Sequence, residues 1–345
     1  MRLTPRDMQK AILKARRELG FKTPVKPRVR SVFYDEEEDF LLIVLADRPD
    51  KSVALGPGGR VLKMVRDELG VSSIAARSFT DILVKKKRIR EALSKARLIA
   101  KRAEGLLREA LERIICLLRA ELDYPPRRWP SYEALDEPAI TVSFSGGIDS
   151  TAMLAVSKRL GLEPLAATVD AGGWMLPKEV KGWINDIVKR LGVEHVYIRG
   201  DERVFDLVLK LARAGRRHPC KMCHEEIERA VLHFALEAGT PMVGFGDLLP
   251  TGRYSIYWLR KGKRKLLRIN LMAALALFKT DTIFIAREVG RPVKKLFFGC
   301  QLLKIIHREH REMMLPSIQR VLREARAGIL EPNQALELVK SIIRP

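Results

Sequence analysis

The sequence predicts an α/β fold in which a parallel-sheet domain follows a small α+β domain and a helical connector. From residue 138 onward, short apolar strand patterns alternate with helical patterns, the order that builds a parallel sheet with right-handed crossovers. Near the start of the chain, two strand patterns precede a pair of short helices and a third strand. Between these regions lie about 40 residues with few helix breakers. We therefore expect domains at 1–80, 81–135 and 136–315, and a C-terminal helical extension at 316–345.

The composition excludes several classes of protein. The chain has 345 residues, of which 47% are hydrophobic, so it is long enough for two or three packed domains. No apolar run reaches the roughly 20 residues that span a bilayer. The first residues lead into a charged helix pattern and not into a signal-peptide core, so we expect a cytoplasmic protein without a membrane partner. Four cysteines in so long a chain do not form a disulfide framework and suggest metal or sulfur chemistry.

The charge of the chain indicates its partners. Lys and Arg outnumber Asp and Glu by 64 to 42, which gives a net charge of +22. An excess of this size favours a polyanionic partner, and the first candidate is nucleic acid. An anionic membrane surface is the alternative, but no clean basic amphipathic anchor stands out.

A strand, a glycine-containing turn and a helix open the third region. Residues 140–144 have the pattern of a buried strand, 145–150 that of a tight turn, and the apolar spacing from 151 that of a helix. Glycines let the backbone approach a ligand closely, and the free N–H groups of a helix N-terminus attract negative charge. This arrangement therefore predicts a phosphate-binding site made by Ser145, Gly146, Gly147, Asp149 and Ser150. A carboxylate at Asp149 makes sense where it holds Mg²⁺ between itself and the phosphates.

The turn lacks the Gly-Lys-Ser/Thr sequence of a Walker loop. Its own sequence at 145–150, Ser-Gly-Gly-Ile-Asp-Ser, resembles the SGGxDS signature of the PP-loop ATP pyrophosphatases, which have an adenine nucleotide alpha hydrolase-like domain. The resemblance implies that the chain binds ATP and Mg²⁺, releases pyrophosphate and adenylates a substrate. The alternative is an ordinary Ser/Gly turn that caps a helix.

The same resemblance suggests further residues of the nucleotide site. The family holds adenosine at the end of the second strand, here Val169 and Asp170, although a strand-terminal turn explains Asp170 equally well. Gly244 and Asp247 are the only positions that match the family's Gly-His-Asn-Leu-Asp-Asp-like sequence after the fourth strand. Lys279, in a helix expected over Leu271 to Thr282, is placed to neutralise the departing pyrophosphate unless it is a surface lysine.

Three of the four cysteines form a second constellation. Cys220 and Cys223 open a helix as a Cys-x-x-Cys pair, Cys300 follows later, and three thiolates leave one position of a metal site open. With the upstream loop, they resemble the iron–sulfur-dependent tRNA thiolation enzymes. The resemblance implies a [4Fe–4S] cluster on Cys220, Cys223 and Cys300, with Cys220 and Cys300 as catalytic candidates. It also implies a hydrosulfide, from an unknown sulfur donor, that attacks the activated base.

Two other interpretations of these cysteines stay open. Zinc is the first, with His218 or His224 as the fourth ligand. The second has no metal and places a persulfide on Cys220 or Cys300. The remaining cysteine, Cys116, lies in an apolar run, and we expect it to pack in the core.

A Gly-x-x-Gly turn stands between two short helices of the first region. A helix that Pro24 and Pro27 break, two strands joined by an acidic turn at 35–39, and the helix–turn–helix at 51–66 resemble a KH RNA-binding domain, especially the kind found in transcription and translation factors. Such a turn lets the backbone of about four nucleotides lie against it. The RNA-binding candidates are Gly56, Pro57, Gly58, Gly59, Arg60 and Lys63. The alternative is a glycine-rich turn without an RNA role.

Three remaining segments have weaker patterns. The connector, which we expect Gly105 to divide and a linker at 124–130 to follow, carries nine Lys and Arg residues between 85 and 102, either as a solvated face or as an RNA contact. Residues 254–265 interleave aromatic and basic side chains, which suits RNA stacking as well as a plain basic hairpin. Residues 303–345 are amphipathic helices that cover the sheet or contact a second copy, so a homodimer is conceivable.

These patterns lead to one functional expectation and two alternatives. We expect an ATP-dependent tRNA-modifying enzyme that adenylates a base carbonyl, releases pyrophosphate and replaces the carbonyl oxygen with sulfur. The first alternative is a PP-loop adenylating ligase that forms an amide or amine and carries a structural zinc. The second is an ATP-sensing RNA-binding protein. The sequence does not name the tRNA position that is modified.

Overall fold

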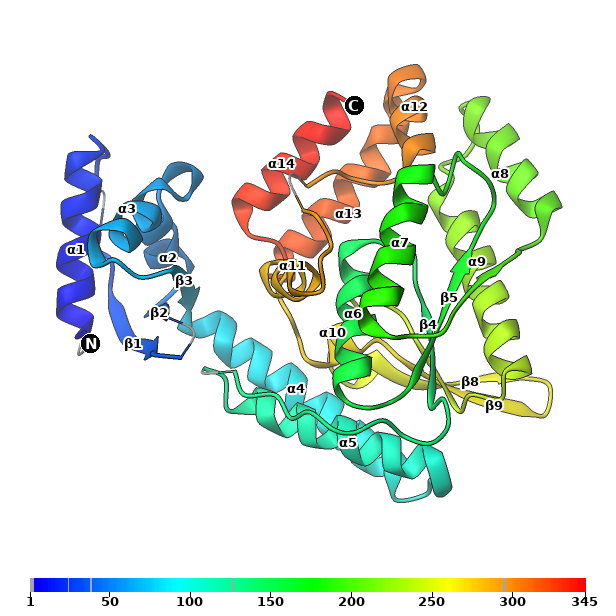
Figure 1. Cartoon of the computed structure of the whole chain (residues 1–345). Helices are drawn as coiled ribbons and strands as arrows, with labels where there is room; N and C mark the ends of the chain where they lie inside the picture. The colour runs from blue at the N-terminus through cyan, green and yellow to red at the C-terminus, as the bar shows by residue number, and fades with distance from the viewer. Residues whose placement is uncertain (1–2, 24, 38, 126, 294–295) are drawn as a thin grey trace. The chain divides into compact units, whose positions relative to one another are not determined.

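A computed structural model describes residues 3–345 apart from 24, 38, 126, 294 and 295. Three expectations fall on these positions and lie outside the described residues: the helix break at Pro24, Glu38 of the acidic turn and Pro126 of the linker. The chain divides into two compact units, Met1–Lys87 with Glu121–Arg128, and Arg88–Ala120 with Trp129–Pro345. Figure 1 shows the elements of both units along the chain. The domain boundaries expected at residues 80, 135 and 315 stay predictions.

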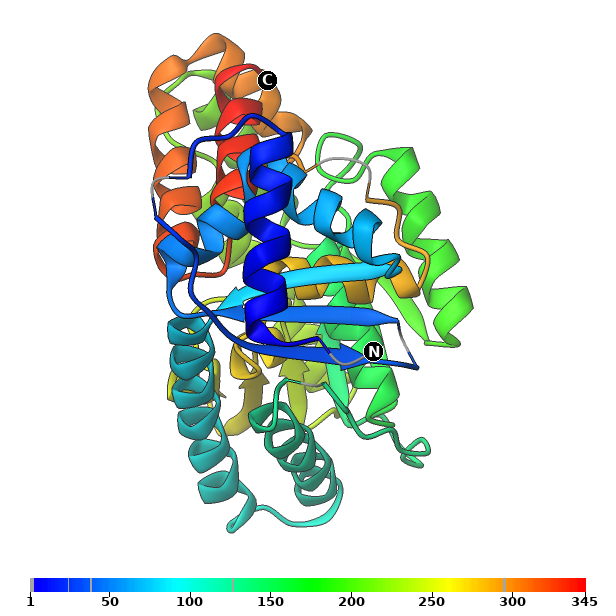
Figure 2. The same cartoon turned by 90° about the vertical axis from the view of Figure 1, so that its left-hand side faces the viewer.

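The first unit contains a three-stranded sheet with one helix before it and two helices within it. Strand β1 pairs antiparallel with β2, and β2 pairs parallel with β3. Figure 2 shows helix α1 lying across this sheet, where Met8 and Ile12 reach the core formed with Leu41, Ile43 and Val65. The element order α-β-β-α-α-β matches the strand and helix order expected from the sequence. Its elements are α1 (Pro5–Glu18), β1 (Val29–Asp35), β2 (Phe40–Leu45), α2 (Arg48–Leu55), η1 (Pro57–Gly59), α3 (Arg60–Leu69) and β3 (Ser73–Ser78).

Two long helices follow, α4 (Phe79–Ala100) and α5 (Gly105–Leu122). The break at Gly105 confirms the expected division of the connector. Lys85 of α4 and Glu121 of α5 form an ion pair of 2.8 Å with side chains that are 1% and 0% exposed. A buried lysine at the start of the basic run shows that this run is not one uniformly solvated face.

The second unit is built on a six-stranded sheet in the order β6-β5-β4-β7-β9-β8. All neighbours pair in parallel except β8 and β9, which form the antiparallel hairpin at one edge. This confirms an α/β fold with a mostly parallel sheet. The strands are β4 (Ile140–Ser143), β5 (Pro164–Val169), β6 (His195–Ile198), β7 (Met242–Gly244), β8 (Ile256–Lys261) and β9 (Arg264–Ile269).

Helices pack to either side of this sheet (Figure 1). Because both faces are covered, β5 is buried along its whole length, as continuous apolar strands of parallel sheets are. Apart from the short turns η2 (Gly252–Ser255) and η3 (Arg311–Met313), the helices are α6 (Ile148–Arg159), α7 (Lys178–Leu191), α8 (Glu202–Arg213), α9 (Cys220–Glu237), α10 (Leu271–Ala274), α11 (Lys279–Glu288), α12 (Gln301–Glu309), α13 (Met314–Arg326) and α14 (Pro332–Ile343).

The strand order of the six-stranded sheet indicates where a ligand can bind. The chain runs from β4 outward to β5 and β6, then returns to place β7 on the other side of β4. In open α/β sheets this reversal leaves a crevice at the carboxyl ends of the two strands, here β4 and β7. The Ser/Gly turn at 145–150 follows β4 directly and so lies at that point.

The helices after β9 differ in part from those expected from the sequence. The helix expected over Leu271 to Thr282 is wrong as a single element, because α10 ends at Ala274 and α11 begins at Lys279, with Ala276 between them at φ 46°. The C-terminal helices α13 and α14 pack on each other and on Ile148 and Ile283, at the starts of α6 and α11. Within the part of the chain that the structure describes, no helix combines the length and the apolar character required to cross a bilayer.

Candidate nucleotide and sulfur site

The phosphate-loop candidates form one compact turn between β4 and α6. The backbone N–H of Ser145 donates to Ser150 Oγ at 3.3 Å, and the two hydroxyl oxygens lie 3.1 Å apart. Gly146 has φ +67°, and a Cβ there would lie 2.8 Å from the Ile184 side chain. The turn therefore requires glycine at this position, and the serines tie its two ends together.

Asp149, on the first turn of α6, faces the first turn of α11. Lys279 Nζ lies 2.8 and 2.7 Å from its two carboxylate oxygens, and Thr282 Oγ1 donates to Oδ1 at 2.8 Å. The structure thus brings together the two residues that the sequence singled out for Mg²⁺ and pyrophosphate. Sequence reasoning missed Thr282, although its spacing of three residues from Lys279 places both side chains on one helix face.

Arg291 is a second residue that sequence reasoning missed. Its Nε donates to the carbonyl oxygen of Gly146 at 2.7 Å, and its guanidinium carbon lies 3.8 Å from the centre of the Trp183 ring. Burial lowers the pKa of Arg291, with the charge of Glu179 acting in the opposite direction. No local pattern signals this role, because Arg291 and Gly146 lie 145 residues apart.

The end of β7 comes into direct contact with the phosphate loop. A Cβ on Gly246 would lie 2.6 Å from the carbonyl carbon of Asp149, so only glycine permits this approach. Gly244 is buried, and a Cβ there would overlap the side chain of Met153. Gly244 therefore sits at a packing contact between β7 and α6, and Gly246 is the glycine closest to the loop.

Asp247 pairs with a buried arginine that also pairs with a second carboxylate. Arg268 lies 3.1 Å from Asp247 and 2.6 Å from Glu228, and its side chain is only 8% exposed. The guanidinium also lies 4.1 Å from the centre of the Phe245 ring. Arg268 thus fixes the carboxylate of Asp247 one residue beyond the contact between Gly246 and the phosphate loop.

The residues expected to hold adenosine are engaged with the protein itself. Val169 is 6% exposed and packs in the core. Asp170 forms an ion pair with Lys181 and accepts the Gly172 N–H at 2.9 Å. Burial raises the pKa of Asp170, but the Lys181 and Gly172 hydrogen bonds outweigh it and hold the pKa below its usual value.

The three cysteine candidates gather between α9 and α12. Cys220 and Cys223 lie on the first turn of α9, and Cys300 is the residue before α12. Burial raises the pKa of Cys220 to about 11 and that of Cys223 to about 12, and the charge of Cys300 adds to both shifts. All three are free thiols, and Cys223 and Cys300 pack on the same apolar cluster.

His218 and His224, the two histidines proposed as zinc ligands, have different surroundings. His218 accepts the Cys220 N–H on Nδ1 at 3.4 Å, and its Nε2 lies 3.0 Å from Ser317 Oγ, so both ring nitrogens are engaged. His224 is exposed, and desolvation followed by the charge of Arg320 lowers its pKa. Over the described residues, no three His, Cys, Asp or Glu side chains meet in the arrangement of a metal site. The thiols suit soft metals chemically, but their present geometry does not fit one.

The RNA-binding candidates form the turn between α2 and α3 in the first unit. Gly56, Gly58 and Gly59 all have φ between +64° and +75°. A Cβ on Gly56 would overlap Val61, whereas nothing lies within 4 Å of one on Gly58 or Gly59. Pro57 and Gly58 are exposed, as are Arg60 and Lys63 on the following helix. The turn thus presents an open backbone with two cations beside it.

Comparison with known proteins gives one relative and no family. No protein-family model matches the chain. Over 208 residues, which is 60% of this chain, the sequence is 29% identical to uncharacterized protein MJ1638 of Methanocaldococcus jannaschii, and the match covers 75% of that relative. The relative is itself uncharacterized, so the likeness carries no activity to this chain.

Proposed function

We propose that the chain is a PP-loop ATP pyrophosphatase that adenylates a carbonyl group on a tRNA base and replaces its oxygen with sulfur. The observation that carries this proposal is the pairing of Asp149 with Lys279 beside the 145–150 turn. The turn lies at the reversal of strand order, where open α/β sheets bind ligands. A carboxylate and an ammonium next to a phosphate cradle are the groups that ATP cleavage at the α-phosphate requires.

The first step uses the nucleotide site alone. The 145–150 turn and the N-terminus of α6 bind the phosphates, and Arg291 holds the turn in place through Gly146. Mg²⁺ bound at Asp149 would neutralise phosphate charge. The base carbonyl oxygen attacks the α-phosphorus, the bond to the β-phosphate breaks, and Lys279 stabilises the pyrophosphate that leaves.

The second step uses the cysteine site. AMP is a far better leaving group than the original carbonyl oxygen, so a sulfur nucleophile displaces it and the oxygen departs with AMP. The sulfur is the outer atom of a persulfide on Cys220 or Cys300, which an external sulfane-sulfur donor forms. It bonds to the base carbon as the bond to the AMP oxygen breaks. A second thiol of the cluster then attacks the inner sulfur, which releases the thiolated base and leaves a disulfide that an external dithiol reduces.

Two features favour RNA as the substrate. The net charge of +22 favours an extended polyanionic partner. The Gly56–Gly59 turn, followed by exposed Arg60 and Lys63, offers the open backbone and cations that nucleotide binding by a KH-like turn requires. The KH-like identity of the first unit is part of the proposal.

The experiment measures pyrophosphate release from ATP with and without unmodified tRNA, followed by mass spectrometry of the tRNA nucleosides. We expect RNA-dependent release in the wild type and at least a 100-fold loss in Asp149→Asn, with tRNA affinity nearly unchanged. The matched control is Asp186→Asn, which alters an exposed carboxylate on α7. Equal ATP consumption by wild type and Asp149→Asn would refute the assignment, and a product that gains nitrogen and not sulfur would replace thiolation with amine transfer.

A further inference from the structure

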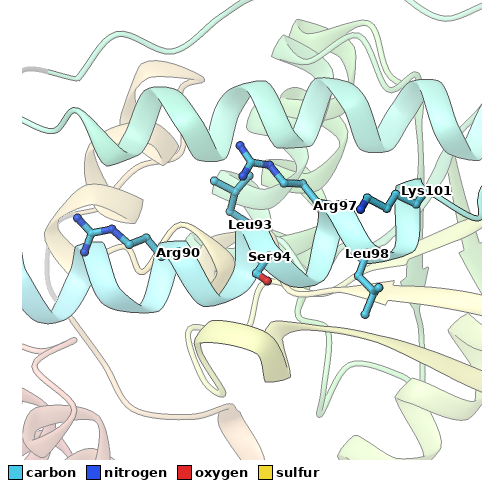
Figure 3. A pocket seen from close by; sticks show the side chains of 6 residues that line it. All are labelled: Arg90, Leu93, Ser94, Arg97, Leu98 and Lys101. Carbon is cyan, nitrogen blue, oxygen red and sulfur yellow. The ribbon is translucent and has the colours of Figure 1, made fainter.

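A groove of about 420 Å³ lies along the second-unit part of helix α4. Five side chains of that helix and Lys101, the residue after it, line the groove, and Figure 3 shows them along one stretch of the chain. The lining residues are Arg90, Leu93, Ser94, Arg97, Leu98 and Lys101. Their spacing of three, four and seven residues puts them on one helical stripe.

The charge of this stripe is of one sign. Three of its six residues are cations and none is a carboxylate. Arg90, Arg97 and Lys101 are all exposed, and none of them forms an ion pair with a carboxylate among the residues that the structure describes. At 1.5 Å of rise per residue, their Cα atoms are spaced about 10 Å and about 6 Å along the helix axis. The stripe therefore presents a row of positive charge to solvent.

Other basic residues of the same run serve the fold. Lys85 is buried against Glu121, and Arg88 donates to the carbonyl oxygen of Ala327 at 3.0 Å. The basic residues between 85 and 102 thus include two groups. Lys85 and Arg88 hold the helices and a C-terminal segment together, and Arg90, Arg97 and Lys101 line the groove.

We propose that the α4 groove binds the sugar–phosphate backbone of the substrate RNA, an inference that rests on the proposed function. Arg90, Arg97 and Lys101 pair with successive phosphates, and Ser94 donates a hydrogen bond between them. Leu98, which is 55% exposed, supplies the apolar contact that a ribose face accepts. Contacts of this kind position an RNA without reading its sequence.

A membrane surface fits the groove less well. A helix that lies on a bilayer needs a wide apolar face directed at the lipid. Along the groove, most apolar side chains of α4 are turned inward instead, with Ile89, Ala92, Leu93 and Ala96 all at most 5% exposed. Leu98 is the large apolar residue that the groove exposes, so cationic contacts dominate its surface.

The test compares two triple variants of equal charge change. R90Q/R97Q/K101Q removes the groove cations. K95Q/R102Q/R119Q removes three cations that do not line the groove: Lys95 on α4, Arg119 on α5 and Arg102 in the turn between them. Binding of bulk tRNA is measured by fluorescence anisotropy over a series of KCl concentrations. We expect the groove variant to bind tRNA at least 10-fold more weakly and to lose about two to three units of salt slope. The control variant should stay within about threefold of wild type.

Three outcomes would overturn this assignment in distinguishable ways. Equal loss in both variants would remove the groove from RNA binding and leave the proposed function standing. A wild-type protein that does not bind tRNA would remove the proposed function itself. Binding to phosphatidylglycerol vesicles that the groove substitutions abolish, with tRNA affinity unchanged, would assign the groove to a membrane instead.

Discussion

The ammonium of Lys279 lies 2.7 and 2.8 Å from the two carboxylate oxygens of Asp149, across 130 residues of sequence. The two side chains are 14% and 31% exposed, so the pair is partly shielded from solvent screening. In this arrangement Lys279 occupies the face of Asp149 that a divalent cation would use. Binding of Mg²⁺ with ATP would therefore exchange one cation for another and direct the ammonium toward the phosphates.

Replacing Lys279 by Met keeps the length of the side chain and removes its charge. We expect pyrophosphate release to fall about 100-fold, as when a preorganised donor to a developing anion is lost. The Mg²⁺ concentration for half-maximal activity should fall, because Asp149 no longer has a competing ammonium. Steady-state kinetics over a Mg²⁺ titration measure both effects. Lys178→Met, at the exposed start of α7, is the control. An unchanged turnover in Lys279→Met would show that the lysine serves only to pair Asp149.

Arg291→Lys tests whether Arg291 stabilises the conformation of the 145–150 turn. Lysine keeps the charge but loses the planar group that both stacks on Trp183 and donates to Gly146. A looser loop binds ATP less well, so we expect KM for ATP to rise about 10-fold with a smaller change in kcat. Arg287→Lys on the neighbouring helix surface should leave both constants within about twofold. A fall in kcat alone would instead indicate that Arg291 acts on the reacting phosphates.

The glycine turn of the first unit allows a charge-specific test. The double variant P57D/G58D adds two carboxylates to an exposed turn, and P57N/G58N adds side chains of the same size without charge. Asp and Asn both tolerate the left-handed backbone at Gly58, where no atom crowds a Cβ. We expect the aspartate pair to weaken tRNA binding at least 10-fold, and the asparagine pair to weaken it much less. Equal affinities would separate this turn from RNA binding.

The sequence predicted most elements that local patterns define. The strand before the 145–150 turn, the helix after it, the second strand that ends at Val169 and the division at Gly105 are confirmed because each depends on periodicity or a breaker within a few residues. The single helix over Leu271 to Thr282 failed, since Ala276 carries no breaker signal and the bend is imposed by tertiary packing.

The residues of the candidate site also divide into those that a local sequence motif defines and those that only long-range contacts define. Asp149 and the glycines lie in one contiguous motif, which is why sequence reasoning found them. Thr282 and Arg291 reach the motif from more than 130 residues away, so only the fold reveals them. Long-range contacts of this type have no local pattern from which they can be predicted.

The ion pair between Lys85 and Glu121 makes a strong prediction for stability. Glu121→Gln removes the buried carboxylate that lies 2.8 Å from the ammonium of Lys85 and 2.9 Å from Arg127. We expect a loss of about 3–5 kcal/mol in the free energy of unfolding, the usual cost of breaking a buried pair. Urea denaturation measures it. Glu112→Gln, which removes an exposed pair with Arg108, should cost less than about 1 kcal/mol.

The difference in unfolding free energy between wild type and Glu121→Gln should depend on pH in a defined direction. Burial raises the pKa of Glu121, but the charges of Arg127 and Lys85 outweigh it and hold the pKa below the ordinary value of 4.5. A lowered folded-state pKa means that the stabilisation is complete above about pH 4.5 and is lost as the pH falls through the lower value. The difference between wild type and Glu121→Gln should therefore shrink on acidification. A difference that stays constant or grows would contradict the assigned charge state.

The three clustered thiols should act as one sulfur site. Serine replacements of Cys220, Cys223 and Cys300 are each expected to abolish thiolated nucleoside while pyrophosphate release continues, because adenylation precedes sulfur transfer. The matched control is Cys116→Ser, since Cys116 lies on α5 outside the cluster. Thiolated product from Cys300→Ser would exclude it from the site.

Analysis of iron, zinc and acid-labile sulfide in the same proteins, purified without oxygen, identifies the carrier. If iron and sulfide are lost in all three cluster variants but kept in Cys116→Ser, the thiols must move from their present positions into a cluster-binding arrangement. Zinc lost in the same way would favour a structural site and with it the ligase alternative. Metal-free protein that still thiolates tRNA would place the transferable sulfur on a thiol as a persulfide.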